Sequence, residues 1–175
     1  FSNYASWQIL EARTIAEQCG KTAPSVSQVL YNLLIRQLDL EYAGFARRHP
    51  IHTTVYNPLA AGLLARAPAV GAPIPKGSRF ATNPMYPRRY WNDALIGFAA
   101  QLQEVAAAAG VDLVTLAYAW LAGRPGVDSI LVGPGSVAHL DVAFEACAVE
   151  LSAATRTRID ELHRAFVGTD VSYAR

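Results

Sequence analysis

The sequence predicts an α/β fold in which short parallel strands alternate with helices in one domain spanning residues 1–175. Two observations support this prediction. Short β-branched and aromatic segments, such as "IHTTVY" at 51–56, are typical of strands inside a parallel sheet. Between them, apolar residues recur every three or four positions and are bounded by capping residues and glycines, as in helices. This alternation favours parallel strands joined by right-handed crossovers.

The first part of the chain has the pattern of a helix, a strand and a second helix. Apolar residues at helical spacing extend from Ile9 to Cys19 behind a candidate cap at Ser6. A buried strand is predicted at 26–31, within "SVSQVLY". The helix that follows this strand has Asp39 as its candidate N-cap.

The middle of the chain combines a strand, a long loop and two helices. The strand occupies 51–56, and the loop at 57–92 is rich in Pro and Gly. A loop of this length in a compact domain is usually functional or mobile. Asp93 and Asp112 are positioned to cap the two helices that follow.

The last part of the chain predicts a strand at 128–133 and two helices capped by Ser136 and Ser152. The side chains predicted to face the core are Val137, Leu140, Phe144 and Cys147 in the first helix, and Ile159, Leu162 and Phe166 in the second. Both an open doubly wound sheet and part of a (β/α)8 barrel fit this order of elements. Three strands and a strand end at Phe1 amount to about half of such a barrel, which needs about 250 residues in all.

Composition excludes several classes of function. With 15 Lys and Arg against 14 Asp and Glu, the chain lacks the basic surface that a nucleic acid demands. No apolar run approaches the roughly 20 residues that cross a bilayer, so we expect no membrane partner. The four His residues lack metal-ligand spacing. The only cysteines, Cys19 and Cys147, both lie on predicted apolar stripes, which suits a reducing cytoplasm.

Three segments together carry a resemblance to a known family. They are "FSNYASWQ" at the start, "QVLYNLLIR" at 28–36 and "VYNPLAAGLL" at 55–64. In this order and spacing they resemble the C-terminal half of an aldo-keto reductase, an NADPH-dependent (β/α)8-barrel enzyme that reduces aldehydes to alcohols. The segments "RFATNPMYPRRYW" and "SYAR" resemble more particularly the aflatoxin-aldehyde and succinic-semialdehyde reductase branch. The resemblance covers the whole chain and implies NADP(H) as cofactor and a small aldehyde as substrate.

The resemblance implies four residues around the nicotinamide ring. A carboxamide needs a donor and acceptors at fixed positions, and Ser2, Asn3 and Gln28 supply this set near the ends of predicted strands. The family places a tyrosine at the position of Tyr56, where its ring can stack on the nicotinamide. Without the resemblance, Ser2 and Asn3 simply form a turn before a helix, and Tyr56 packs into the mouth of the barrel.

The resemblance also implies a loop that cradles the pyrophosphate. In "NPLAAGLL" the proline fixes the backbone and a glycine permits close approach of a phosphate. The residues implied are Asn57, Pro58, Leu59, Gly62 and Leu63.

A third cofactor segment lies in "LVGPGSVAHL", where a strand ends and a helix begins. Free N–H groups at a helix start suit a phosphate, and the family binds the adenosine 2′-phosphate between the positions of Gly133 and Ser136. The chain departs from the family pattern at His139 and Ala143, where relatives usually carry Gln or Arg and then Asn. His139 is either a ligand contact or a solvated surface residue.

The substrate site implied by the resemblance is built from arginines. Arg89 and Arg175 correspond to residues that clamp the carboxylate of a short aldehyde acid, for which the planar guanidinium is well shaped. Arg88 is an alternative to Arg89. In the simpler interpretation, the loop and tail arginines, Arg89 and Arg175, are only solvated. Tyr90 and Trp91 are expected to form an apolar wall.

The catalytic Asp, Tyr, Lys and His of aldo-keto reductases all lie on strands that the resemblance places before Phe1, so no catalytic residue is assigned here. We expect an inactive part of a reductase, with a strand directly upstream of Phe1. The alternative is a half-barrel that acts alone as a nucleotide-binding or interaction module. A half-barrel exposes unpaired edges, so a homodimer or pairing with an N-terminal half is expected.

Overall fold

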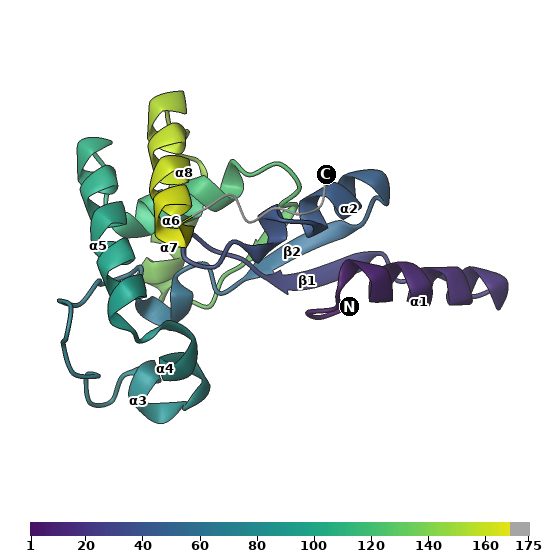
Figure 1. Ribbon diagram of the computed structural model, residues 1–175, viewed down its shortest axis with the longest axis horizontal. Helices are drawn as coiled ribbons and strands as arrows, with labels where there is room; N and C mark the ends of the chain where they lie inside the picture. The colour runs from purple at the N-terminus through teal and green to yellow at the C-terminus, as the bar shows by residue number, and fades with distance from the viewer. Residues whose placement is uncertain (169–175) are drawn as a thin grey trace.

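The computed structural model describes residues 1–168 and contains three parallel strands in one sheet (Figure 1). The strands are β1 (Val26–Leu30), β2 (His52–Tyr56) and β3 (Ser129–Leu131), and they lie side by side in the order β1-β2-β3. A fourth extended segment forms a parallel bridge between Ser2 and Gln28 of β1. The predicted α/β fold with parallel strands is confirmed.

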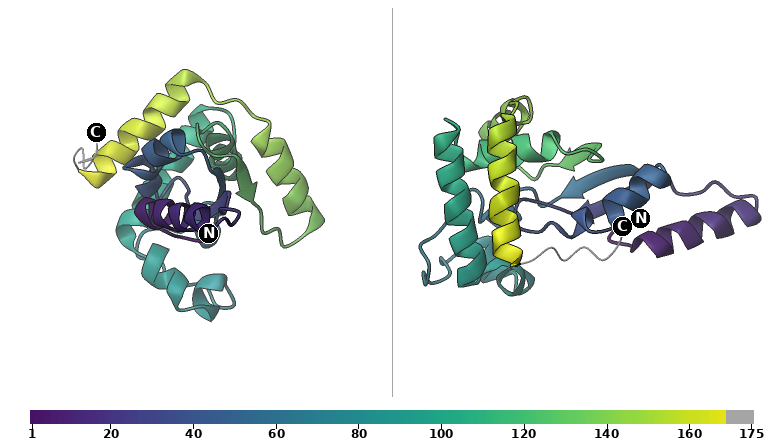
Figure 2. Two further views of the ribbon diagram at one scale, coloured as in Figure 1. Left: turned by 90° about the vertical axis from the view of Figure 1, so that its right-hand side faces the viewer. Right: turned by 45° about the horizontal axis from the view of Figure 1, so that its top comes forward.

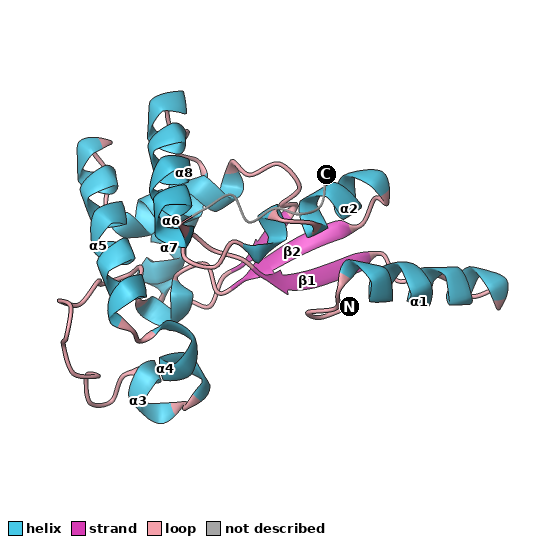
Figure 3. Cartoon of the chain, in the orientation of Figure 1, coloured by secondary structure: helices cyan, strands magenta, loops and turns pink. Residues whose placement is uncertain are grey.

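Helices account for most of the remaining structure, as Figure 3 shows. They are α1 (Ser6–Gln18), α2 (Tyr42–Arg48), α3 (Arg79–Thr82), α4 (Met85–Tyr90), α5 (Asp93–Ala108), α6 (Leu113–Ala122), α7 (Val137–Cys147) and α8 (Ala153–Val167), with 3₁₀ turns η1 (Gln37–Asp39) and η2 (Ala60–Gly62). The predicted order of helices and strands is confirmed. The long loop differs from prediction because it contains η2, α3 and α4, and the Ser78 hydroxyl caps α3 by accepting the Ala81 N–H.

The two faces of the sheet are covered differently. Successive side chains of a strand point to opposite faces, and in β1 and β2 one face is buried while the other is half-buried. The buried face is turned towards α2, where the Tyr42 hydroxyl lies 3.0 Å from Thr53 Oγ1. The half-buried face carries Gln28 and Tyr56. The sheet therefore presents two residues of the implied cofactor site on its more open side.

Most of the large apolar side chains are buried among the later helices. Helix α5 packs against α6 and α8, and α6 packs against α7. Figures 1 and 2 show α5 and α8 side by side at one end of the molecule, with α1 and α2 beside the strands at the other. The Phe98 ring of α5 stacks on Phe166 of α8 with centroids 4.7 Å apart. Ile159 is fully buried as expected.

Three predicted helix caps are corrected. Helix α1 begins after Ala5, because the Ser6 hydroxyl donates to Glu41 instead. Helix α5 is capped by Asn92, which accepts the Leu95 N–H, one residue before the predicted cap at Asp93. Asp39 does not cap α2, because its carboxylate binds two arginines.

The inward face of α7 is also corrected. Val137 and Phe144 were predicted to face the core, but they are 75% and 69% exposed. Ala143 and Ala146 are buried instead and pack near Tyr118 of α6, because small side chains let the two helices approach closely. Cys19 is exposed rather than buried, since it lies at the end of α1, which buries only Ser6 and Ile9.

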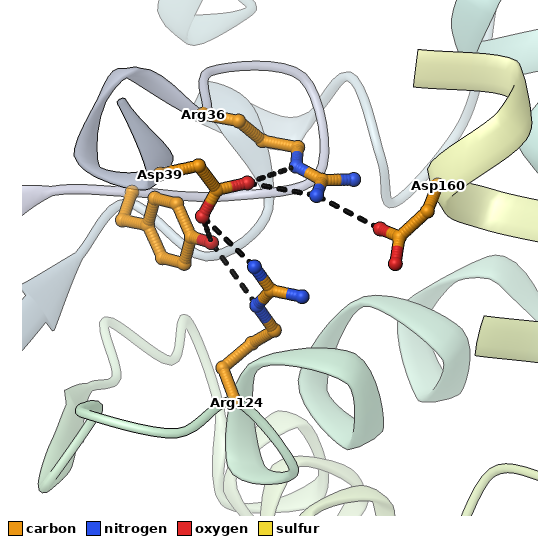
Figure 4. Close-up of polar contacts among 5 residues, drawn as sticks. Arg36, Asp39, Arg124 and Asp160 are labelled. Atoms are coloured by element: carbon orange, nitrogen blue, oxygen red, sulfur yellow. Dashed lines mark hydrogen bonds and ion pairs between the residues drawn. The ribbon is translucent and has the colours of Figure 1, made fainter. Parts of the chain in front are cut away.

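A network of charged side chains joins segments that are far apart in the sequence (Figure 4). Asp39 Oδ2 accepts from Arg36 Nη2 at 2.7 Å, and Asp39 Oδ1 accepts from Arg124 Nη2 at 2.9 Å. The Tyr31 hydroxyl also donates to Asp39. Arg36 Nη2 reaches Asp160 of α8 at 2.8 Å. The network therefore ties the chain after β1 to the end of α6 and to α8.

The pKa values follow from this arrangement. Burial by itself would raise the pKa of Asp39, but the Tyr31 hydrogen bond and the charges of Arg36 and Arg124 lower it below its usual value. Burial, and then the charge of Asp39, raise the pKa of Tyr31 well above its usual value. Asp39 therefore stays ionised, and Tyr31 stays a donor.

We expect Asp39→Asn to lower the free energy of unfolding by about 2 kcal/mol at pH 7, because it leaves two partly buried arginines without their carboxylate. Urea denaturation followed by circular dichroism measures this. Because the folded-state pKa of Asp39 lies below its unfolded value of 3.8, its contribution is full above that pH and is lost as the pH falls through the folded value. When the pH is lowered below about 4, the free energy of unfolding should therefore fall less in the variant than in the wild type. Exposed Asp141→Asn is the control, and equal acid sensitivity of wild type and Asp39→Asn would refute the assignment.

Candidate functional site

A cleft of about 610 Å³ opens beyond the carboxyl ends of β2 and β3. Its walls come from the segment that follows β2, from α3 and α4, from α6 and from the turn between β3 and α7. The residues lining it that the sequence analysis singled out are Tyr56, Asn57, Pro58, Leu59, Gly62, Arg89, Gly133 and His139. Segments more than seventy residues apart in the chain thus meet at one place.

The residues implied for the nicotinamide end lie next to this cleft. Asn3 Oδ1 accepts a hydrogen bond of 3.0 Å from the Tyr56 hydroxyl. The Asn3 backbone N–H donates to Gln28 O at 2.9 Å, and Asn3 Nδ2 lies 3.3 Å from Ser2 Oγ. Asn3 has a φ of 57°, a left-handed conformation that Asn tolerates better than most residues. The structure therefore brings Ser2, Asn3, Gln28 and Tyr56 into one group.

The segment after Tyr56 is strained. Asn57, Ala60 and Ala61 all have a positive φ, of 63°, 50° and 61°. For a residue with a Cβ this conformation costs on the order of 1 kcal/mol or more. The Asn57 side chain helps to stabilise it, because Asn57 Oδ1 accepts the Ala61 N–H at 2.7 Å. Five residues of this bend line the cleft, namely Asn57, Pro58, Leu59, Ala61 and Gly62.

Several implied site residues lie elsewhere. Leu63 is buried in the core, and Tyr90 is completely buried with its hydroxyl bonded to two asparagines, so Tyr90 is not the apolar wall that we expected. Ser136 is beside the cleft, but its hydroxyl caps α7 by accepting the His139 N–H at 3.2 Å. Arg175 lies outside the described residues. Ala143, at the other family position that departs from the pattern, is buried against α6.

The cleft is positively charged. Arg79 and Arg89 line it together with His139, and no Asp or Glu is among the described residues that form its walls. The Arg79 guanidinium lies 6.0 Å from the centre of the Tyr86 ring. Arg88, the alternative to Arg89, is exposed and does not line the cleft. The cleft therefore suits an anionic ligand.

The sequence analysis did not identify the cationic and aromatic side chains Arg79, Tyr86 and Tyr118 of the cleft, nor the apolar Ala61, Leu131 and Val132. Arg79 and Tyr86 belong to the same Pro-rich segment as Arg89, and their alignment depends on the short helices α3 and α4, which show no sustained periodicity. Tyr118 was hidden in the apolar pattern of α6. Burial raises the pKa of Tyr118, so that its hydroxyl stays protonated and can donate a hydrogen bond.

Residues 1–168 contain no group of three or more His, Cys, Asp or Glu side chains arranged to hold a metal ion. No single helix in this range has the length and apolarity to cross a membrane, and α5 and α6 meet those criteria only as a pair bent by 87°.

Comparison with known proteins gives the family. Residues 1–164 match the Aldo/keto reductase family. The chain is 30% identical over 155 residues to human aldo-keto reductase family 7 member A3, and the aligned region covers 80% of this chain and 46% of the relative. It is 30% identical to human aflatoxin B1 aldehyde reductase member 2, over 80% of this chain and 43% of the relative. A probable voltage-gated potassium channel subunit beta of Arabidopsis thaliana is 33% identical over 75% of this chain and 41% of its own length. The chain thus spans less than half the length of these relatives, and it belongs to the aldo-keto reductase family.

Proposed function

We propose that this chain forms the cofactor-binding half of a (β/α)8-barrel reductase that uses NADPH to reduce a small aldehyde to an alcohol. Aldo-keto reductases use NAD(P)H, and active sites of such barrels lie at the carboxyl ends of the strands, where this cleft lies. The observation that carries the proposal is the 3.0 Å hydrogen bond from the Tyr56 hydroxyl to Asn3. It joins the cleft to the amide groups that can hold a nicotinamide carboxamide.

The residues present fit a dinucleotide. Gln28 is half-buried, and its side-chain amide has no hydrogen-bond partner within residues 1–168, so that one donor and one acceptor are available for a carboxamide. The ring of Tyr56 lines the cleft and offers a flat face for stacking. Gly62 and Gly133 leave the backbone open, since a Cβ at either position would meet nothing within 4 Å. When bound, NADPH would supply the hydride.

The charge of the cleft supports a second part of the proposal. Arg89 and Arg79 are positioned for an anion, which we assign to the carboxylate of a short aldehyde acid or to the phosphates of the cofactor. Proton delivery is assigned to a different part of the enzyme. The family uses a tyrosine beside a lysine, and neither Lys21 nor Lys76 lines the cleft.

A stand-alone interaction module is the second candidate, and exposed apolar residues favour it. Trp7 on α1 is 66% exposed and Leu10 lies near it on the same helix, while α7 exposes Val137 and Phe144. Burying these two exposed surfaces would favour a homodimer or a complex with an N-terminal half-barrel. Association and cofactor binding can be measured separately.

We expect the chain to bind NADPH in isothermal titration calorimetry and Tyr56→Ala to weaken binding about tenfold, because the variant loses ring stacking worth roughly 1.4 kcal/mol. Tyr56→Phe keeps the ring and should retain most of the affinity. Exposed Arg158→Ala is the control, and a wild type that shows no binding at millimolar NADPH would contradict the site.

We expect Arg89→Ala to weaken NADPH or succinate binding, depending on which anion Arg89 contacts, and the effect should shrink with added salt because the attraction is electrostatic. Titration at low and high ionic strength measures it. Arg88→Ala is the matched control, since Arg88 is exposed beside the cleft without lining it. Equal losses in the two variants would show that only net charge matters.

We expect no oxidation of NADPH by the purified chain with succinic semialdehyde or 2-nitrobenzaldehyde, because none of the described residues that line the cleft is a lysine that could tune a tyrosine to protonate the alkoxide. Absorbance at the nicotinamide band follows the reaction. Turnover that remains after repeated purification would contradict this part of the proposal.

We expect Trp7→Ser combined with Phe144→Ser to reduce self-association measured by light scattering after size-exclusion chromatography, because both side chains lie on exposed apolar surfaces. NADPH affinity should be unchanged. A wild type that is monomeric at high concentration would exclude the homodimer.

A further inference from the structure

Three polar side chains, two of them completely buried, meet beside the cleft. Asn32, directly after β1, and Tyr90, at the end of α4, are both completely buried. Asn32 Nδ2 donates to the Tyr90 hydroxyl at 3.2 Å and to the backbone oxygen of Asn57 at 3.0 Å. Asn57 Nδ2 donates to the same hydroxyl at 2.8 Å. One hydroxyl thus connects the segments after two neighbouring strands to a helix of the long loop.

The orientation of Asn32 is fixed from both ends of its amide. Its Oδ1 accepts the backbone N–H groups of Leu34 and Ile35, both at 3.0 Å. Its Nδ2 makes the two bonds to Tyr90 and Asn57. A buried amide with all these partners is rigid, and removing one partner leaves the others unsatisfied. Asn32 is therefore a fixed support for its neighbours.

The support acts on a segment whose backbone is strained. Asn57, Ala60 and Ala61 have left-handed backbones. Asn57 is bound through its carbonyl by Asn32, through its Nδ2 by Tyr90 and through its Oδ1 by the Ala61 N–H. Strained backbone persists only where surrounding contacts over-determine it.

We propose that Asn32 and Tyr90 are positioning residues that hold the strained segment 57–62 and helix α4 together as one unit. Tyr90 directly follows Arg89, and Asn57 directly follows Tyr56, so the same hydroxyl links the neighbours of a guanidinium and of an aromatic ring that both line the cleft. Only the identity of the ligand in this cleft rests on the proposed function, because the hydrogen bonds among Asn32, Asn57 and Tyr90 are present without a ligand.

The experiment compares Tyr90→Phe with Tyr42→Phe in the full chain. Tyr42 is a matched control, because its hydroxyl is also buried and bonded to Thr53, but on the opposite face of the sheet. Hydrogen–deuterium exchange with mass spectrometry reports opening of 57–64 and 85–91, and calorimetry reports the Kd for NADPH. We expect exchange in both segments to rise together at least tenfold in Tyr90→Phe, with a Kd raised about tenfold. In Tyr42→Phe we expect the exchange rates of both segments and the Kd for NADPH to remain as in the wild type, even when its melting temperature falls as much as that of Tyr90→Phe.

A second variant covers the case in which Tyr90→Phe does not fold. Asn57→Gly suits the left-handed backbone and removes both side-chain bonds of Asn57 while leaving the buried pair intact, and we expect the same faster exchange in 57–64. Unchanged exchange in a folded Tyr90→Phe or in Asn57→Gly, or an equal rise in Tyr42→Phe, would overturn the proposal. If the variants exchange faster but the wild-type chain binds no NADPH, the positioning role of Asn32 and Tyr90 would be supported and the proposed function refuted.

Discussion

The carboxylate of Asp39 is the contact on which the arrangement of the chain depends most. Within residues 1–168, three strands of five, five and three residues are too few to order eight helices by sheet pairing alone. Asp39 collects donors from Tyr31, Arg36 and Arg124, and Arg36 extends the network to α8. The guanidiniums of Arg36 and Arg124 also lie 5.0 Å and 4.9 Å from the ring of Trp120, which anchors the network to the largest buried side chain.

Two adjacent residues contribute separately to the stability of the fold and to the geometry of the cleft. Tyr31 and Asn32 follow β1 directly, and their side chains serve different neighbours. Tyr31 contributes to the ionic network between the sheet and the later helices. Asn32 contributes to the polar support of the segment 57–62. Because one short connection serves both purposes, damage to the ionic network should also disturb the cleft, whereas damage to the cleft support need not unfold the helices.

The sequence predicted the three strands and the longer helices and several residues that line the cleft, but not the short helices of the long loop or features that depend on distant contacts. The order of helices and strands along the chain and three of the six predicted N-caps, Asp112, Ser136 and Ser152, follow from local patterns. The glycines and Tyr56 of the cleft follow from the family resemblance. The phase of α7 did not follow, because Phe144 and Ala143 fit the same helical spacing and only packing against Tyr118 selects the alanine. Asp39 had the pattern of a cap because its partner Arg124 is 85 residues away. Arg79 gave no signal because α3 is a single turn.

The three tryptophans occupy three different environments. Trp7 faces solvent on α1, Trp91 is half-buried with its indole N–H donating to Ala72 O at 3.2 Å, and Trp120 lies between two guanidiniums in the core. Indole emission shifts to longer wavelength in contact with water, so the light emitted by the folded protein is a sum of three distinguishable components. A soluble quencher reaches Trp7 first and Trp120 last. The chain therefore carries an intrinsic optical probe for its outer surface, its long loop and its interior.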